Sequence, residues 1–302
     1  MAAEESYPEL LFVCIFWLLH AIFSLTEYIM AFCYILSAKW RSVFSRDLEA
    51  VDIEGVKNIS KLPKHIAFLV LENDILYDDV AKLVIWSLLV GINVISLYDV
   101  HGKLKRNQGK LLGAINKEYI RYLGMMEPFK LTWRPHDDLD SVVDKSDTVI
   151  VSRDGVMYPD KNGNGISSLA NGTTGNGHSN GHHSDHQNGH IKQVSISLLS
   201  REDGKQDIVN AAKKLGRQVR EGSLQAEDIT VSSVGPHLRT NSVLGDPCVL
   251  VRLGGLASNM DFPPWQLRLT EMYSIPSQRG VTKESLIRVL RQYGRCEQRL
   301  GK

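Results

Sequence analysis

The chain has 302 residues, of which 43% are hydrophobic and 23% are charged, and its formal net charge is +1. This composition is typical of a globular protein, and a net charge so close to zero gives no general attraction for nucleic acid, so we expect no nucleic-acid partner. The four cysteines form no C-x-x-C pair. Their scatter favours reduced thiols in a reducing compartment over a disulfide framework.

The first predicted element is a membrane anchor within residues 1–41. The segment from Leu10 to Leu36 is almost continuously apolar, which is long enough to cross about 30 Å of hydrocarbon with some tilt. A cleaved signal peptide fits less well, because no basic segment precedes the run and no small-residue cleavage site follows it. Two arrangements remain open: the whole run spans the membrane, or residues 10–25 span it and residues 26–36 lie along the interface.

The charges that flank this segment predict its orientation. Acidic residues precede it and basic residues follow it, namely Glu4, Glu5, Glu9, Lys39, Arg41 and Arg46. The positive-inside rule then places the N-terminus in the lumen and everything after residue 37 in the cytosol, as a single-pass protein. Glu27 is costly inside the span and is therefore a candidate functional residue. Asn58 and Asn171 match the glycosylation acceptor pattern, which is common by chance, and would stay unmodified in the cytosol.

After a linker at residues 42–60, the domain at residues 61–302 alternates predicted strands with predicted helices. The apolar runs that indicate strands are His65–Leu71, Asn93–Leu97, Val194–Leu199 and Val249–Arg252, with Phe129–Trp133 and Thr148–Ser152 as further candidates. Helical spacing of apolar residues marks Asp74–Val90, Leu111–Leu123 closed by Gly124, Gln206–Arg220, and Thr282–Gln298 with Thr282 as N-cap. This alternation predicts an α/β fold with a parallel sheet covered by helices, preceded by the transmembrane helix.

A low-complexity insert at residues 161–190 interrupts the domain. It consists mostly of Gly, Asn, Ser and His, and it cannot bury enough apolar surface to order itself. Its histidines are His178, His182, His183, His186 and His190. Composition alone allows a metal site, but we favour a solvated loop with incidental histidines.

Two features near the C-terminus suit an anion such as a diphosphate. One is the buried strand that ends in Arg252-Leu-Gly-Gly255, and the other is the tail Arg299-Leu300-Gly301. The strand at His65 should supply a matching acid, but it ends in Leu71 and Glu72. The sequence therefore reads as part of a diphosphate enzyme that cannot work alone.

Three segments together resemble the cis-prenyltransferase family, which has the undecaprenyl diphosphate synthase fold. They are His65-Ile-Ala-Phe68, Asp207–Lys214 and Asp246–Glu271, in which Val-Arg-Leu-Gly-Gly is followed by Trp-Gln and Thr-Glu. The resemblance covers residues 60–302. The N-terminal anchor and the ending Arg291–Lys302 are similar to the Nogo-B receptor type, the accessory subunit of eukaryotic dehydrodolichyl diphosphate synthase.

The resemblance implies a non-catalytic but required subunit at the endoplasmic reticulum membrane. Its catalytic cis-prenyltransferase partner elongates farnesyl diphosphate with isopentenyl diphosphate to long-chain polyprenyl diphosphate, which supports dolichol synthesis and protein glycosylation. Arg299, Leu300 and Gly301 would reach the partner's active site and contact isopentenyl diphosphate, with Arg299 and Gly301 serving catalysis. Mg²⁺ is expected in the complex, held mainly by the partner, and no metal site is expected in this chain.

The departures from the family pattern define what this chain lacks. Active members have Asp-Gly-Asn at the end of the first strand, where this chain has Leu71, Glu72 and Asn73. Later in the domain, Leu256 and Ser258 replace a Glu and an Arg, and Met260 replaces a Ser. Together these changes remove the allylic diphosphate site, because a metal ligand and a phosphate-binding arginine are lost.

The remaining candidate residues belong to the subunit contact. We predict that Trp265, Phe262 and Glu271 lie at the subunit interface, and that Arg252 pairs with a nearby acid. The strongest alternative function is a membrane receptor or tethering scaffold without a catalytic role, which would have no need of the Arg-Leu-Gly tail. A third alternative, an active homomeric synthase that uses Glu72, conflicts with the missing Asp and Arg.

Overall fold

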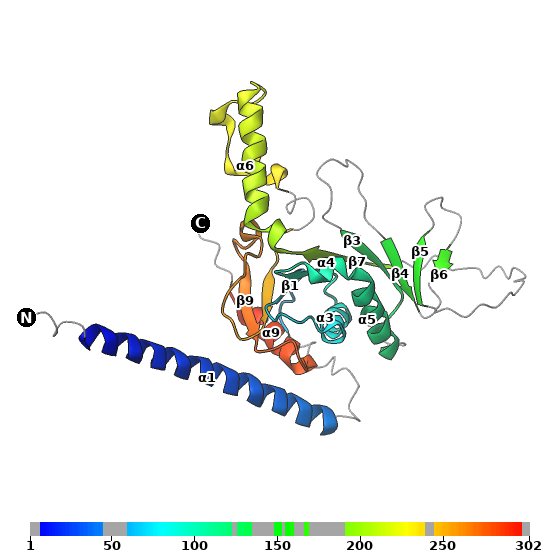
Figure 1. Ribbon diagram of the computed structural model, residues 1–302. Helices are drawn as coiled ribbons and strands as arrows, with labels where there is room; N and C mark the ends of the chain where they lie inside the picture. Colours follow the sequence, from blue (N-terminus) through cyan, green and yellow to red (C-terminus); the bar gives the residue numbers. More distant parts are fainter. Residues whose placement is uncertain are drawn as a thin grey trace, which may run out of the picture.

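The structure is a computed structural model that describes residues 7–44, 59–122, 126–134, 148–152, 155–159, 166–168, 191–238 and 245–297. The N-terminal helix α1 runs from Tyr7 to Phe44 (Figure 1). Its segment Phe12–Met30 is long and apolar enough to cross a membrane, and none of it is buried against the rest of the chain. A core helix of a water-soluble domain would be mostly buried, so this exposure agrees with the predicted anchor.

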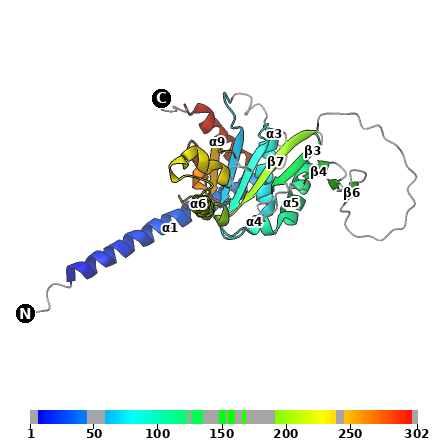
Figure 2. The same cartoon turned by 90° about the horizontal axis from the view of Figure 1, so that it is seen from above.

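The domain is built on one sheet with the strand order β6-β5-β4-β3-β7-β2-β1-β8-β9. The strands are β1 (His65–Val70), β2 (Val94–Asp99), β3 (Phe129–Arg134), β4 (Thr148–Ser152), β5 (Gly155–Pro159), β6 (Ile166–Ser168), β7 (Lys192–Leu199), β8 (Val249–Leu253) and β9 (Glu271–Ile275). The six from β3 to β9 in the sheet order are parallel, and β4, β5 and β6 extend the sheet antiparallel. Figure 2 shows the strands side by side from above. The predicted parallel sheet is therefore confirmed.

Three helices cover one face of this sheet and enclose the main core. They are α3 (Tyr77–Leu89), α5 (Gln108–Arg121) and α9 (Lys283–Arg295), and the short α4 (Lys103–Arg106) precedes α5. Their apolar side chains pack with alternate residues of the strands, for example Phe68 and Val251. Thr282 caps α9 by accepting from the backbone N–H of Ser285, as the sequence predicts. The continuous apolar runs of β1 and β8 follow from burial on both faces.

The opposite face of the sheet carries a smaller apolar cluster. Strand residues such as Leu69, Tyr98 and Leu250 form it together with Phe262. Phe262 belongs to the loop that follows β8 and contains the short helix η4 (Pro264–Gln266). This loop, rather than a long helix, therefore covers the sheet at this point.

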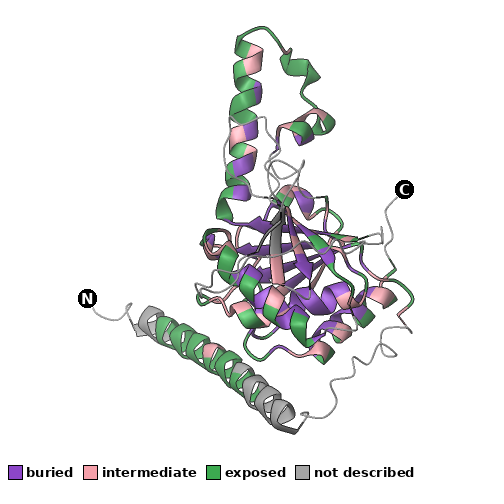
Figure 3. Cartoon of the chain, turned by 90° about the vertical axis from the view of Figure 1, so that its right-hand side faces the viewer, coloured by how far each residue is buried: buried purple, intermediate pink, exposed green. Residues whose placement is uncertain are grey.

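A helical arm, defined here as residues Gly204–Leu238, projects from the domain (Figures 1 and 3). After η1 (Arg201–Asp203) it contains α6 (Lys205–Arg220), η2 (Ala226–Asp228), α7 (Val231–Val234) and η3 (Gly235–His237). Most of its residues are exposed, as the mainly green ribbon of the projecting helix in Figure 3 shows. Only its base is held by the domain.

The structure differs from the sequence-based elements at several places, among them strand β5, which no expected element covered. An additional parallel strand, β9, lies at the edge of the sheet beyond β8. The expected insert contains β6, which pairs with β5 in the register Tyr158 to Ser167. The helix after β1 begins at Tyr77 rather than Asp74. Gly124, Asn58, Asn171 and the five histidines of the insert lie outside the described residues.

Candidate functional site

The loops after the parallel strands meet at the carboxyl edge of the sheet, where α/β proteins bind their ligands. At the end of β1, Leu71 continues the ladder by donating its backbone N–H to the carbonyl of Leu253 over 2.9 Å. Gly254 follows with φ 134°, and a Cβ placed on it would lie 3.0 Å from the Cβ of Leu71. The half-buried Leu71 therefore packs on the backbone of Gly254 and fills the position where the family pattern has an acid.

Glu72 is the carboxylate nearest to this position, and Gln278 occupies both of its oxygens. The backbone N–H of Gln278 donates to Oε1 over 3.0 Å, and its side-chain amide donates to Oε2 over 3.1 Å. The same amide donates to the carbonyl of Asp74, and its oxygen accepts from the backbone N–H of Leu76 over 3.0 Å. Gln278 is fully buried. It therefore ties the loop after β1 to the loop after β9.

These contacts bear on whether the edge fits Mg²⁺, which proteins usually hold through one or two carboxylates together with waters and substrate phosphates. The oxygens of Glu72 and the carbonyl of Asp74 are taken by Gln278. Within the part of the chain that the structure describes, no group of three or more His, Cys, Asp or Glu side chains could hold a metal. The residues at this edge do not fit a magnesium site.

The loop after β8 carries the other departures from the family pattern. Leu256 is 53% exposed, and the hydroxyl of Ser258 accepts from the backbone N–H of Met260 over 3.2 Å. Met260 and Asp261 both have positive φ, at 42° and 61°. Non-glycine residues adopt this region infrequently, and here contacts with the rest of the chain stabilise it.

Contacts with η1 and the base of the arm hold it. Asp261 pairs with Arg201 over 3.2 Å and with Lys205 over 2.9 Å, and the hydrogen bond from Lys205 holds the pKa of this carboxyl below its usual value. A Cβ on Gly204 would overlap the carbonyl oxygen of Asp261. The phenol of Tyr98 donates to the carbonyl of Met260. The loop after β8 is therefore held in place by its own chain, and we call it the strap.

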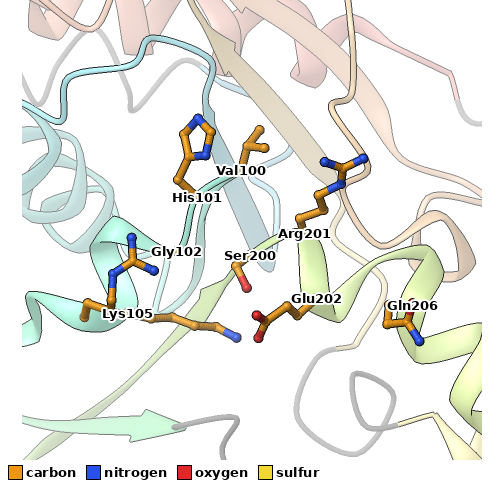
Figure 4. A pocket seen from close by; sticks show the side chains of 9 residues that line it. Val100, His101, Gly102, Lys105, Ser200, Arg201, Glu202 and Gln206 are labelled. Atoms are coloured by element: carbon orange, nitrogen blue, oxygen red, sulfur yellow. The ribbon is translucent and has the colours of Figure 1, made fainter.

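A cleft of about 460 Å³ lies beside the strap, at the ends of β2 and β7 (Figure 4). Its lining includes His101, Lys105, Arg201 and Glu202. Lys105 pairs with the buried Asp203 over 2.5 Å, and Arg201 already pairs with the strap. Because two of its cations are neutralised by carboxylates of the same chain, the cleft offers a diphosphate less charge than its composition suggests.

Arg252, the phosphate-binding candidate on β8, has a partner on the neighbouring strand. Its Nε donates to the hydroxyl of Ser274 over 3.1 Å, where the sequence analysis expected an acid. This bond holds the guanidinium along the β8–β9 surface. At the carboxyl edge, Leu71, Glu72 and Arg252 are thus each packed against or hydrogen-bonded to other residues of the chain.

The opposite, amino edge of the sheet receives the end of α9. Cys296 follows the helix and donates its thiol to Oε1 of Glu271 over 3.1 Å. This bond to the carboxylate is the largest cause of a raised pKa for the thiol, so the thiol keeps its proton at neutral pH. Glu271 is the first residue of β9, and its backbone N–H donates to the carbonyl of Cys248 just before β8. The C-terminal tail therefore leaves the domain at the edge far from Glu72.

The predicted site residues fall into two groups. Arg299, Leu300 and Gly301 lie outside the described residues. Among the predicted interface residues, Phe262 is 1% exposed and its ring lies 5.4 Å from that of Tyr98. Trp265 and Glu271 are partly exposed. Phe262 is thus a core residue of its own chain, while the interface role of the other two stays a prediction.

The arm presents apolar side chains that the sequence analysis did not assign to a surface. Val209 is 43% exposed, Ile229 37% and Val231 68%. The helical spacing of α6 predicted a helix with one buried face, but that face meets the domain only near its base. The available signal is the composition of α6, whose charged residues surround a narrow apolar stripe too small to cover a sheet.

The sequence is similar to known proteins over most of its length, although no protein-family model matches it. The mouse protein named dehydrodolichyl diphosphate synthase complex subunit Nus1 is 31% identical over 249 residues, which are 82% of this chain and 68% of the mouse protein. The nus1 subunit of Schizosaccharomyces pombe is 23% identical over 305 residues, covering 98% of this chain and 99% of that protein. The structure of lavandulyl diphosphate synthase from Lavandula x intermedia, in complex with dimethylallyl diphosphate, has a TM-score of 0.45 at 15% identity, over 80% of this chain and 99% of that one.

Proposed function

The chain belongs to the NUS1 family of dehydrodolichyl diphosphate synthase complex subunits, and we propose that it is the non-catalytic but required subunit of a heteromeric cis-prenyltransferase. Its partner is the catalytic subunit, which elongates farnesyl diphosphate with isopentenyl diphosphate to a long-chain polyprenyl diphosphate for dolichol synthesis and protein glycosylation. The observation that carries the proposal is the commitment of Glu72 to Gln278, with Leu71 filling the adjacent position. This arrangement supports a chain that does not bind an allylic diphosphate and its Mg²⁺ at this edge by itself.

The second part of the proposal is that this chain donates Arg299 and Gly301 to the partner's active site. Helix α9 has 13 residues and is about 20 Å long at 1.5 Å per residue. The backbone of Arg299 extends at most about 11 Å from Cys296, at about 3.6 Å per residue. Because the tail begins at the amino edge of the sheet, this short backbone reach supports a contact of Arg299 with a diphosphate held by another chain.

The chemistry of the tail suits that role. In the proposed reaction the allylic C–O bond to diphosphate breaks, a C–C bond forms to isopentenyl diphosphate, and a proton leaves. An arginine offers a fixed fork of donors to phosphate oxygens, and preorganised donors that meet developing charge lower the barrier. Gly301 would let the backbone approach closely, since it carries no side chain. The partner would hold the Mg²⁺.

The arm supports an assembly with another subunit. Stable interfaces bury about 1,200–2,000 Å² in total and place apolar side chains at their centre. Val209, Ile229 and Val231 are exposed on one projecting element, and a catalytic subunit packed along it would cover them. The β9 edge next to Trp265 offers a second surface on the same subunit.

We further propose that α1 anchors the chain in the endoplasmic reticulum membrane with the domain in the cytosol. The exposed apolar segment Phe12–Met30 supports the span, and the flanking charges support the orientation. Asn58 and Asn171 should then carry no glycan in cells. A glycosidase-sensitive mass shift that disappears in Asn171→Gln would place the domain in the lumen and overturn the orientation.

The tail hypothesis is tested by steady-state incorporation of isopentenyl diphosphate, with the chain co-purified with its catalytic subunit. Arg299→Ala should co-purify normally, while turnover falls by about ten- to a thousandfold, as for the loss of one charge-assisted donor. Arg299→Lys should rescue in part, because a point charge does not reproduce the fork. Arg295→Ala, an exposed arginine in the last turn of α9, is the matched control. If Arg299→Ala co-purifies with unchanged turnover and KM, a tethering role becomes the better assignment.

A further inference from the structure

The last turn of α9 is held on several sides at the point where the tail leaves the domain. The segment Ile59–Lys61, where the linker from the membrane helix meets the domain, lies against Gly294. The hydroxyl of Ser60 donates to the carbonyl of Gly294 over 2.9 Å. A Cβ on Gly294 would lie 2.8 Å from Cγ2 of Ile59 and 3.4 Å from the carbonyl of Lys61. Glycine is therefore required here for the close approach of the entering segment.

The same turn is also fixed from the side of the sheet. Tyr293 is 2% exposed, and the ammonium of Lys61 lies 4.8 Å from its ring centroid. Burial is the main cause that raises the pKa of Tyr293, to about 12, so its phenol stays neutral and packed. Cys296 caps the helix with its N–H on the carbonyl of Tyr293 over 3.0 Å and bonds Glu271 on β9 through its thiol.

We infer that these contacts form a clamp that sets the direction of the catalytic tail, so that Ser60, Glu271 and Cys296 are positioning residues for the reaction. The inference rests on the proposed function, because the clamp acts only through Arg299. Its geometry carries the argument: Cys296 is three residues before Arg299, and its backbone leaves the helix with an extended conformation, at φ −77° and ψ 121°. Fixing Cys296 therefore restricts where Arg299 can go.

The clamp also joins two parts of the protein that the sequence places at opposite ends. Ser60 ends the linker that follows the membrane helix and Lys61 begins the domain, and both touch the last helical turn before the tail. The membrane attachment and the tail thus share one corner of the domain. The residues just before the tail are therefore held close to the residues that follow the linker from the membrane helix.

The test uses the full chain co-purified with its catalytic subunit, with isopentenyl diphosphate varied. Cys296→Ala removes the thiol donor and should raise KM for isopentenyl diphosphate or lower turnover by about three- to tenfold, the effect of one lost hydrogen bond. Cys296→Ser keeps a donor and should stay near the parent. Ser60→Ala tests the other side of the clamp and should act in the same direction. Glu284→Ala, exposed at the far end of the same helix, is the control.

A double-mutant cycle separates this inference from the proposed function. In an Arg299→Ala chain, Cys296→Ala should have no further effect, because the residue that it positions is gone. An equal loss in both backgrounds, or no loss in Cys296→Ala and Ser60→Ala while Arg299→Ala is impaired, would overturn the clamp. An unimpaired Arg299→Ala overturns the proposed function instead. Trypsin cleavage after Arg295 gives a readout besides activity: it should be faster in Cys296→Ala than in Cys296→Ser, and equal rates would contradict the clamp.

Discussion

Gln278 lies against Glu72 at the end of β1, with its backbone N–H on one carboxylate oxygen at 3.0 Å and its side-chain amide on the other at 3.1 Å. The two residues are 206 positions apart in the chain. Through this pair, the edge of the sheet that binds ligands in related folds becomes part of the protein's own packing. The pair therefore fixes the loop after β1 to the loop after β9.

Removing Gln278 should therefore cost stability. Gln278→Leu keeps the size of the side chain but leaves the carboxylate of Glu72 and the backbone N–H of Leu76 without their partner. We expect the free energy of unfolding to fall by about 3 kcal/mol, measured by urea denaturation of the purified chain. Arg279→Leu, at the exposed neighbouring position, should change it by less than about 0.5 kcal/mol. Equal effects of the two substitutions would show that the Glu72–Gln278 pair does not hold the loops.

The chain by itself should not condense isopentenyl diphosphate with farnesyl diphosphate. The side chain of Leu71 has no oxygen to offer a metal, and both carboxylate oxygens of Glu72 already accept hydrogen bonds from Gln278. Leu71→Asp should not create activity, because the strap after β8 still lacks a phosphate-binding arginine. The measurement is radiolabel incorporation by the purified chain, with the reconstituted complex as positive control. Magnesium-dependent product from the chain alone, in a preparation free of host synthase, would contradict the non-catalytic assignment.

The sequence predicts the elements whose burial is complete and misses those whose pairing depends on distant residues. Strands β1, β2, β7 and β8 are continuous apolar runs, which is the pattern of a parallel strand covered on both faces. Strand β9 has only its last residue fully buried, so no apolar run or clean alternation marks it. Strand β6 adds to the sheet through backbone pairing of Ile166–Ser168, which leaves almost no trace in composition.

The sequence predicts which residues of the family pattern are missing from this edge, but it does not predict which residues take their place. The absence of Asp at Leu71 and of Arg at Ser258 can be read from the sequence alone. The partner of Glu72 cannot, since Gln278 is a single polar residue in a loop far along the chain. The same contact explains why α3 begins at Tyr77: the amide of Gln278 holds the carbonyl of Asp74 and the N–H of Leu76 outside the helix.

The boundary of the insert can be tested by two deletions. Replacing residues 170–190 with a short Gly/Ser linker should leave the unfolding midpoint unchanged, because such loops carry little packing. Replacing residues 161–190 also removes β6 and exposes the backbone edge of β5. Hydrogen exchange of Gly155–Pro159 should then become faster in the longer deletion than in the shorter one. Identical exchange in the two would mean that β6 does not protect β5.

Two glycines, one at the base of the arm and one near the far end of α6, should respond in opposite directions to the same change. Gly204→Ala places a Cβ on the carbonyl oxygen of Asp261, so the strap must shift, and we expect a loss of at least about 2 kcal/mol. Gly216→Ala lies within α6, where nothing approaches within 4 Å of the added Cβ, and should stabilise by up to about 1 kcal/mol. Thermal unfolding of both variants measures the difference. If Gly204→Ala is as stable as the parent, the strap is not packed on η1.

The stability of the domain should fall in acid because of His65 at the amino end of β1. Burial lowers the pKa of His65 from 6.5 to about 4, and its Nε2 lies 2.8 Å from the hydroxyl of Ser96. Between these two values the unfolded chain binds a proton that the folded chain does not, so stability is full above about pH 6.5 and is lost as the pH falls towards 4. The difference of 2.5 units corresponds to about 3 kcal/mol at most. In His65→Gln this part of the pH dependence should disappear, so the two unfolding curves converge in acid, while the exposed His101→Gln serves as control. Urea unfolding from pH 7.5 to 4.5 measures both, and equal slopes for the parent and His65→Gln would show that His65 is not the titrating group.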